Sequence, residues 1–152
     1  MTTTKLKERL RADLTAAMKS RDELRSATLR MALASITNEE VAGSVARELS
    51  DTEVVTVLTR EVKKRREAAE AFAGAGRSEQ AARERAEGEV LGEYLPAQLT
   101  DSELRAMVEE AVSETGAAGP KAMGAVMKVL TPRIAGRAEG GRVAAAVRSA
   151  LN

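Results

Sequence analysis

Hydrophobic side chains recur every three to four residues along the first part of the chain, with charged residues between them. This is the period of an amphipathic helix, and no alternating strand pattern interrupts it. The pattern predicts four helices, at about 4–19, 22–40, 51–72 and 79–94. The side chains expected to face inward are Leu6, Leu10, Leu14, Met18, Leu24, Ala27, Met31, Leu33, Ala34, Ile36, Val54, Val55, Leu58, Val62, Ala69, Phe72, Ala82, Ala86, Val90 and Tyr94. Four amphipathic helices with short loops predict a four-helix bundle.

Start and stop signals mark the ends of these helices. Ser50, with Glu53 three positions later, is a capping-box pattern that predicts the start of the third helix. The Gly-Ala-Gly segment 74–76 predicts its end, because glycine adopts the left-handed conformation that closes helices. Ser78 is expected to cap the fourth helix, and the glycine and serine at 43–44 are expected in a loop.

A boundary is expected near Pro96. Proline disfavours the helical conformation in the residue before it, so the fourth helix should end there. Thr100 with Glu103 forms a second capping box and predicts a new helix from about 101 to 116. The chain is therefore expected to divide into two domains.

Two more helices are predicted after this one. Pro120 suits the first turn of a helix, which should end near Pro132, and a glycine-rich loop should separate it from a last helix over about 141–150. The inward side chains of the second half are expected to be Leu104, Val108, Ala111, Val112, Met123, Val126, Met127, Leu130, Val143, Val147 and Leu151. The prediction is an all-α protein, with a four-helix bundle over 1–95 and a smaller three-helix bundle over 96–152.

Composition narrows the possible chemistry. The 152 residues include no histidine and no cysteine, which removes the commonest general base and the usual zinc and iron–sulfur ligands. No phosphate-cradling glycine motif occurs, so no cofactor or metal site is predicted. No catalytic residue is predicted either, and the isolated chain is expected to be inactive as an enzyme. The N-terminus has no apolar signal segment and no run is long enough to span a membrane, so a cytoplasmic location is expected.

Charge is unevenly distributed although the net charge is only +1. From residue 116 onward, cationic side chains outnumber the single acidic residue, Glu139. Such a local excess can form an anion-facing patch, or it can compensate the acidic helix before it. Near absence of aromatic residues argues against base stacking on single-stranded RNA, so a folded RNA held through its phosphates is the nucleic acid to consider. The candidate nucleic-acid contacts are Lys121, Lys128, Arg133, Arg137 and Arg142.

The densest charge run, EVKKRRE at 61–67, has two interpretations. Pairs of opposite sign four residues apart, Glu61 with Arg65 and Arg66 with Glu70, are typical of a solvated helix face. Alternatively, Lys63, Lys64 and Arg66 form a ridge that contacts phosphate. The bracketing glutamates favour the solvated face.

Several short segments, in a fixed order over essentially the whole chain, form a recognisable series. The longest are EVKKRRE at 61–67, YLPAQL at 94–99 and GRAEG at 136–140, and shorter ones lie at 17–19, 29–31, 71–72, 75–77, 101–104 and 123–127. Together they resemble the YqeY family. The chain departs from the family pattern at Ala122, Ala125 and Glu139.

The resemblance implies a four-helix bundle followed by a three-helix bundle, as the periodicity predicts. It also implies kinship with the C-terminal tail domain of the B subunit of the aspartyl/glutamyl-tRNA amidotransferase, which helps to hold the tRNA. The family label, carbon–nitrogen ligase with glutamine as amido-N donor, describes that whole complex, whose catalytic part this chain lacks.

Three functions follow as hypotheses. The first is a tRNA-binding accessory module that acts with a tRNA-amidating complex. The second is a helical protein–protein adaptor without RNA binding. The third, an enzyme in its own right, is disfavoured because no acid–base set is present.

Overall fold

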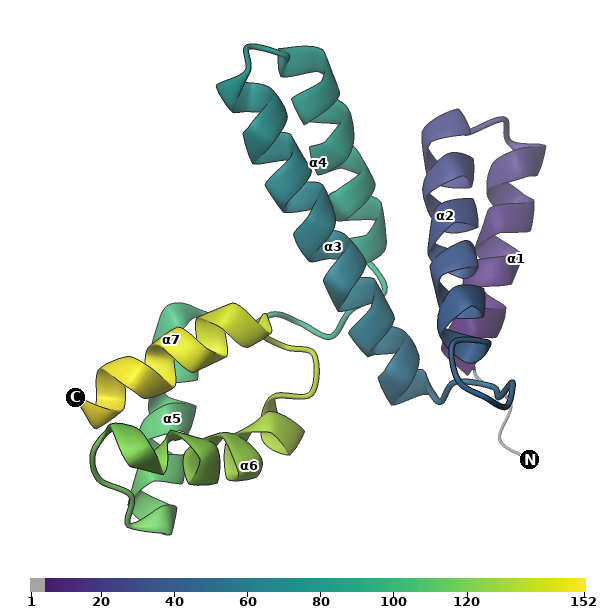
Figure 1. Cartoon of the computed structure of the whole chain (residues 1–152). Helices are drawn as coiled ribbons and strands as arrows, with labels where there is room; N and C mark the ends of the chain where they lie inside the picture. The colour runs from purple at the N-terminus through teal and green to yellow at the C-terminus, as the bar shows by residue number, and fades with distance from the viewer. Residues whose placement is uncertain (1–4) are drawn as a thin grey trace. The chain divides into compact units, whose positions relative to one another are not determined.

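A computed structural model of the chain describes residues 5–152. Within that range it is all-α, with seven α-helices, one short 3-10 helix and no strand, which confirms the predicted fold class. The chain forms two compact units, one up to Leu95 and one from Pro96 onward (Figure 1). Each unit is described by itself below.

The N-terminal unit contains two helical hairpins. Its helices are α1 (Lys5–Lys19), α2 (Glu23–Glu40), α3 (Asp51–Gly74) and α4 (Ser78–Gly92). In Figure 1, α1 runs antiparallel to α2, and α3 antiparallel to α4. Contacts of α2 with both α3 and α4 join the two hairpins into one bundle.

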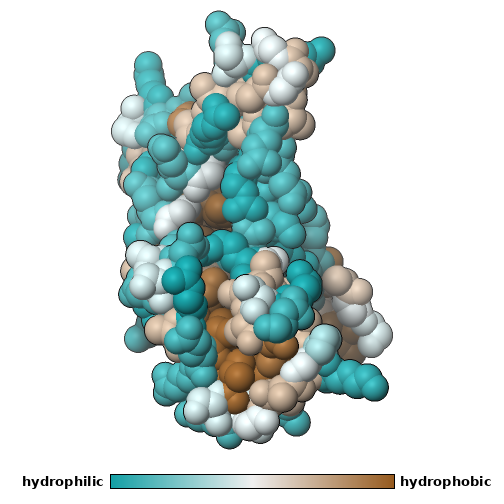
Figure 2. Space-filling view, turned by 90° about the vertical axis from the view of Figure 1, so that its left-hand side faces the viewer, coloured by the Kyte–Doolittle hydropathy of each residue, from teal (hydrophilic) through white to brown (hydrophobic). Residues whose placement is uncertain are grey.

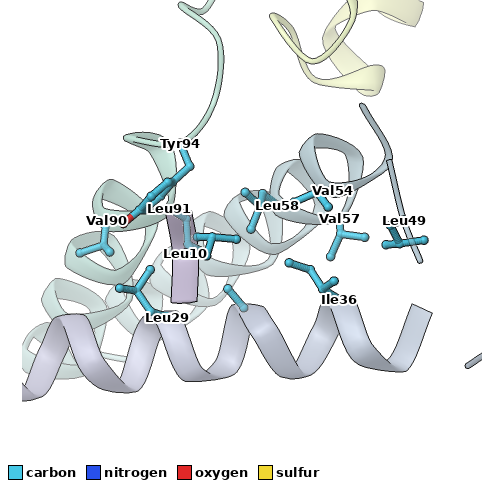
Figure 3. Close-up of a cluster of buried hydrophobic side chains, with 11 residues drawn as sticks. Leu10, Leu29, Ile36, Leu49, Val54, Val57, Leu58, Val90, Leu91 and Tyr94 are labelled. Atoms are coloured by element: carbon cyan, nitrogen blue, oxygen red, sulfur yellow. The ribbon is translucent and has the colours of Figure 1, made fainter. Parts of the chain in front are cut away.

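Leucine, isoleucine and valine side chains from all four helices meet in the core of the N-terminal unit. Figure 3 shows Leu10 of α1, Leu29 and Ile36 of α2, and Leu58 of α3 directed toward one another. These side chains are fully buried. Leu91 of α4 and Leu49, from the loop before α3, complete the same cluster. With so few aromatics in the chain, branched aliphatic side chains fill this space, as close-packed helices require.

Tyr94 ties the end of α4 to α1. Its ring is buried, and its hydroxyl donates a 2.5 Å hydrogen bond to Oδ2 of Asp13. The guanidinium of Arg9 lies 4.6 Å from the ring centre, a cation–π distance. Burial, followed by the hydrogen bond to Asp13, raises the pKa of Tyr94 to about 12. The residue next to the domain boundary is therefore fixed by both its ring and its hydroxyl.

The predicted end signals are confirmed at most helix termini. Ser50 and Glu53 form the capping box at the start of α3, and the helix ends at Gly74, before left-handed Gly76. The predicted cap at Ser78 is wrong. The helix α4 begins at Ser78 itself, and Arg77 takes the capping position without a side-chain hydrogen bond.

The C-terminal unit contains three helices and the short 3-10 turn. They are α5 (Asp101–Thr115), η1 (Pro120–Ala122), α6 (Met123–Ile134) and α7 (Gly140–Leu151). The capping box of Thr100 and Glu103 is present at the start of α5. The core is formed by inward side chains of all three α-helices, among them Leu104, Val108, Val126, Leu130, Val143 and Val147.

Two details of the second helix in this unit differ from prediction. Residues from Pro120 form a 3-10 turn before the α-helix proper begins at Met123. The helix also continues through Pro132 to Ile134 instead of ending at the proline. Proline in the last turn removes only one hydrogen bond of the helix, and burial of Ile134 in the core favours the continuation.

Several residues that were predicted to face inward lie on the surface instead. Met18 is 48% exposed, and Ala34 and Ala82 lie on the surface. Leu29 and Ala81 are fully buried although they were not predicted. The errors at Met18, Ala34 and Ala82 fall where apolar residues are adjacent in the sequence, because periodicity alone does not choose between neighbours there.

None of the helices in the described part of the chain has both the length and the apolar character that crossing a membrane requires.

Candidate nucleic-acid interface

All five cationic residues predicted as nucleic-acid contacts lie in the C-terminal unit. Lys121 is in η1, Lys128 and Arg133 are in α6, Arg137 is in the loop after α6, and Arg142 is in the first turns of α7. The structure separates them by what their side chains contact.

Lys121 and Lys128 are exposed lysines of a stretch without acidic residues. Neither forms an ion pair with any residue of the described chain. No aspartate or glutamate occurs over 115–138, so η1 and α6 contain no carboxylate. Gly124 and Ala125, which lie four and three positions before Lys128, are also exposed and share its side of the helix. Small residues there leave the surface beside the lysine stem open.

Arg133 is paired with a carboxylate of the neighbouring helix. Its Nη2 lies 2.6 Å from Oε2 of Glu114 on α5. The hydrogen bond to Glu114, together with the charge of that residue, raises the pKa of Arg133. The pair cross-links the end of α5 to the end of α6.

Arg137 fixes the segment that leads into α5. Its backbone carbonyl accepts a 2.7 Å hydrogen bond from the Leu99 N–H, and its Nε donates to the carbonyl of Ala97 at 3.3 Å. The neighbouring Gln98 side chain donates to the carbonyl of Gly136 at 3.0 Å. The YLPAQL and GRAEG segments of the sequence are therefore hydrogen-bonded to each other, although some forty residues separate them.

Arg142 holds the same segment from α7. Its Nη2 donates to the carbonyl of Leu99 at 3.1 Å and to Oδ1 of Asp101 at 2.8 Å. Asp101 is the first residue of α5, so this arginine links the starts of two helices. Arg137 and Arg142 thus both make structural contacts within the unit.

The charge run at 61–67 is only partly a solvated helix face. Glu61 is 5% exposed, and its carboxylate accepts a 2.9 Å hydrogen bond from Ser35 on α2. The predicted i,i+4 pair is present, since Arg65 Nη2 lies 3.3 Å from Glu61. Glu61 lies three residues after Leu58 and four after Val57, which places it on the buried stripe of α3. That spacing is the signal by which the sequence could have revealed its burial.

Arg65 is the centre of a network of carboxylates. Besides Glu61, its guanidinium lies 3.7 Å from Glu84 and 3.5 Å from Glu87 on α4. Its side chain and those of Glu84 and Glu87 are each less than one-fifth exposed. Arg83 adds a second cation, 3.1 Å from Glu87. The network was not predicted from the sequence, because Glu84 and Glu87 come from a different helix than Arg65.

The basic side chains of the run that were considered for phosphate contact have acidic neighbours. Lys63 Nζ lies 4.0 Å from Glu67, and Lys64 Nζ lies 3.4 Å from Glu61. Because a carboxylate lies beside each of them, Lys63 and Lys64 offer less positive charge to a ligand than Lys121 and Lys128 do.

A groove of about 530 Å³ runs between α5 and α7. Its floor includes Leu104 and Val108, and alanines of α7 form one wall. Charged residues lie at its edges, among them Asp101, Arg105, Glu109 and Arg142. Figure 2 shows a band of hydrophobic surface on the face that the C-terminal unit presents to the viewer.

Within residues 5–152, no cluster of acidic side chains is arranged to hold a metal ion. The five candidate residues carry ammonium and guanidinium groups, whose chemistry is the binding of anions.

Comparison with known proteins identifies the family. A search of curated proteins finds no match. The family model described as Yqey-like protein matches residues 7–151, which span both units and include the hydrogen-bonded segments at 94–99 and 136–140. The chain therefore belongs to the YqeY-like family.

Proposed function

We propose that this protein is a tRNA-binding accessory module that acts with a tRNA-amidating complex. The observation that carries the proposal is that Lys121 and Lys128 are exposed, form no ion pair with the described residues, and lie in a segment that contains no acidic residue. The resemblance of the chain to the tail domain that holds tRNA in the amidotransferase supports the choice of ligand.

Physical chemistry favours phosphate at these two lysines. An ammonium group without an internal partner can bind phosphate without breaking an ion pair, and each such contact releases a counterion from the RNA. Small residues beside Lys128 allow a phosphodiester to approach the helix. Binding of this kind contacts the backbone and does not read bases. The partner would therefore be recognised as a folded, densely charged RNA.

The three arginines have a different part in the proposal. Arg133, Arg137 and Arg142 hold α5, α6, α7 and the segment before α5 together. They keep the elements that carry Lys121 and Lys128 in position and contribute less to RNA contact than these two lysines. The proposal thus divides the predicted contacts into binding and positioning residues.

The two units receive different roles in this account. The segment 96–152 serves as the tail-like domain that contacts tRNA, and the segment 1–95 is a separate helical domain. In this proposal the chain contributes binding, and transfer of the amide from glutamine belongs to the partner complex.

The proposal is tested with the double variant Lys121→Ala/Lys128→Ala. Affinity for unmodified tRNA is measured by fluorescence anisotropy over a range of salt concentrations. We expect the slope of log affinity against log salt to fall by about two units, about one for each lost phosphate contact. The variant Lys121→Arg/Lys128→Arg keeps the charges and should keep the slope.

The contrary result is equally clear. A wild-type chain without salt-dependent affinity for tRNA would exclude the RNA role. An alanine variant that binds as tightly as the wild type, and with the same slope, would exclude Lys121 and Lys128 as RNA contacts.

The groove between α5 and α7 favours the adaptor as the second candidate function. A partner helix could lie along the small side chains of Ala145, Ala146 and Ala150. Ala145→Arg places a long side chain at an exposed position of the groove and should leave folding intact. If this variant loses a protein that the wild type retains, while neither binds tRNA, the adaptor function replaces the RNA function.

A further inference from the structure

The turn between α1 and α2 contains an arginine in a conformation that favours glycine. Arg21 has a φ of 59°. Its N–H donates to the carbonyl of Met18 at 3.2 Å, and the N–H of Asp22 donates to the carbonyl of Ala17 at 2.9 Å. These two bonds form a Schellman motif, in which the left-handed position is usually glycine.

The same motif closes α3, and there the left-handed residue is Gly76, with a φ of 75°. The N–H of Gly76 donates to Ala73 and that of Arg77 to Phe72, in the same pattern. The N-terminal unit therefore contains two equivalent helix ends, one with glycine and one with arginine. A side chain at the left-handed position is unfavourable for folding, so the turn itself gives no reason for an arginine.

The charges around this turn are unbalanced. Its nearest carboxylates are already engaged, since Asp22 accepts from the Arg25 N–H at 3.0 Å and Glu23 lies 3.2 Å from Arg83. No residue in the described part of the chain forms an ion pair with the exposed cations at this end of the hairpin. These cations are Lys19, Arg21 and Arg30.

An exposed methionine lies among these cations. Met18 is 48% exposed, and its sulfur lies 3.4 Å from Nη2 of Arg30. The thioether thus holds the guanidinium of Arg30 at the end of the hairpin where Lys19 and Arg21 lie. Cations around one apolar side chain suit the sugar–phosphate backbone, which offers both negative charge and an apolar ribose face.

We propose that the α1–α2 turn is a second RNA contact, in which Lys19, Arg21 and Arg30 bind phosphates beside Met18. The inference rests on the proposed tRNA-binding function and adds the N-terminal unit to it. Two contact surfaces on one chain increase the affinity for a large ligand when both engage it at once.

The test compares Arg21→Gly with Arg21→Lys in the full chain. Arg21→Gly removes the cation and relieves the left-handed strain, so its melting temperature should equal or exceed that of the wild type. The slope of log affinity for tRNA against log salt should nevertheless fall by about one unit. Arg21→Lys keeps the charge and should keep the slope.

Gly76→Ala is the matched control for strain. It places a side chain at the equivalent left-handed position and should lower the melting temperature without changing the slope. If Arg21→Gly keeps the full slope while Lys121→Ala/Lys128→Ala reduces it, the α1–α2 turn is not an RNA contact and the proposed function stands. If Arg21→Gly reduces the slope and Lys121→Ala/Lys128→Ala does not, the assignment of Lys121 and Lys128 as RNA contacts is wrong. A wild-type chain that does not bind tRNA overturns both.

Discussion

Arg65 on α3 lies between carboxylates of its own helix and of α4. Its guanidinium is within 4 Å of Glu61, Glu84 and Glu87, and all four side chains are largely withdrawn from water. Removing one partner from a buried ion pair is costly because the opposite charge remains without compensation. Lys64 and Arg83 also pair with Glu61 and Glu87, whereas Glu84 has Arg65 as its one ion-pair partner among the described residues.

We therefore predict that Arg65→Ala lowers the free energy of unfolding of the N-terminal unit by about 3 kcal/mol. Arg60→Ala is the control, because Arg60 forms an exposed pair with Glu39 at 3.2 Å and should cost less than about 1 kcal/mol. Urea unfolding followed by circular dichroism measures both. Equal losses for the two variants would mean that Arg65 is an ordinary surface residue.

Residue roles were the least predictable part of the molecule. Lys121 and Arg137 have similar charge and similar sequence surroundings, and only the fold shows that Arg137 bonds to Ala97 while Lys121 has no ion-pair partner. The carboxylates around Arg65 come from a helix distant in sequence. Such pairings depend on how helices face each other, which periodicity does not specify.

Helices and their ends were largely predictable because their signals are local. The two capping boxes are present where the sequence predicts them. The continuation of α6 past Pro132 was not predicted, since it depends on burial of Ile134 against other helices. Most helix boundaries therefore follow from local signals, and the others depend on tertiary packing.

The start of α3 gives a prediction of pH dependence. Hydrogen bonds from Arg47, and then from the Ser50 N–H, lower the pKa of Glu53 to about 2, from an ordinary value of 4.5. A carboxyl group with a lowered pKa in the folded state stabilises the fold above pH 4.5. This stabilisation is lost as pH falls from about 4.5 toward 2.

We expect the melting temperature of the wild type to fall more steeply over that interval than that of Glu53→Gln. The glutamine keeps the capping-box geometry and does not titrate, so it isolates the charge. Thermal unfolding at successive pH values measures the difference. Parallel curves for the two proteins would contradict the role assigned to Glu53.

At the scale of the whole molecule, the chain is an all-α member of the YqeY-like family. The fold class and the family could both be predicted from the sequence, because helical period and ordered short segments extend over nearly its whole length. Function could not be predicted to the same depth. The proposed RNA contacts differ from other surface cations in which of them have partners, and that is visible only in the folded chain.

In the proposed function, Lys121 and Lys128 bind RNA, whereas Arg133, Arg137 and Arg142 hold the C-terminal unit together. Lys128→Ala and Arg137→Ala, measured side by side for melting temperature and tRNA affinity, test it most directly. We predict that Lys128→Ala weakens binding at an unchanged melting temperature. Arg137→Ala should keep the affinity and lower stability by about 1 kcal/mol, since it loses its hydrogen bond to Ala97. Unchanged binding by Lys128→Ala, or weakened binding by Arg137→Ala without loss of stability, would contradict the account.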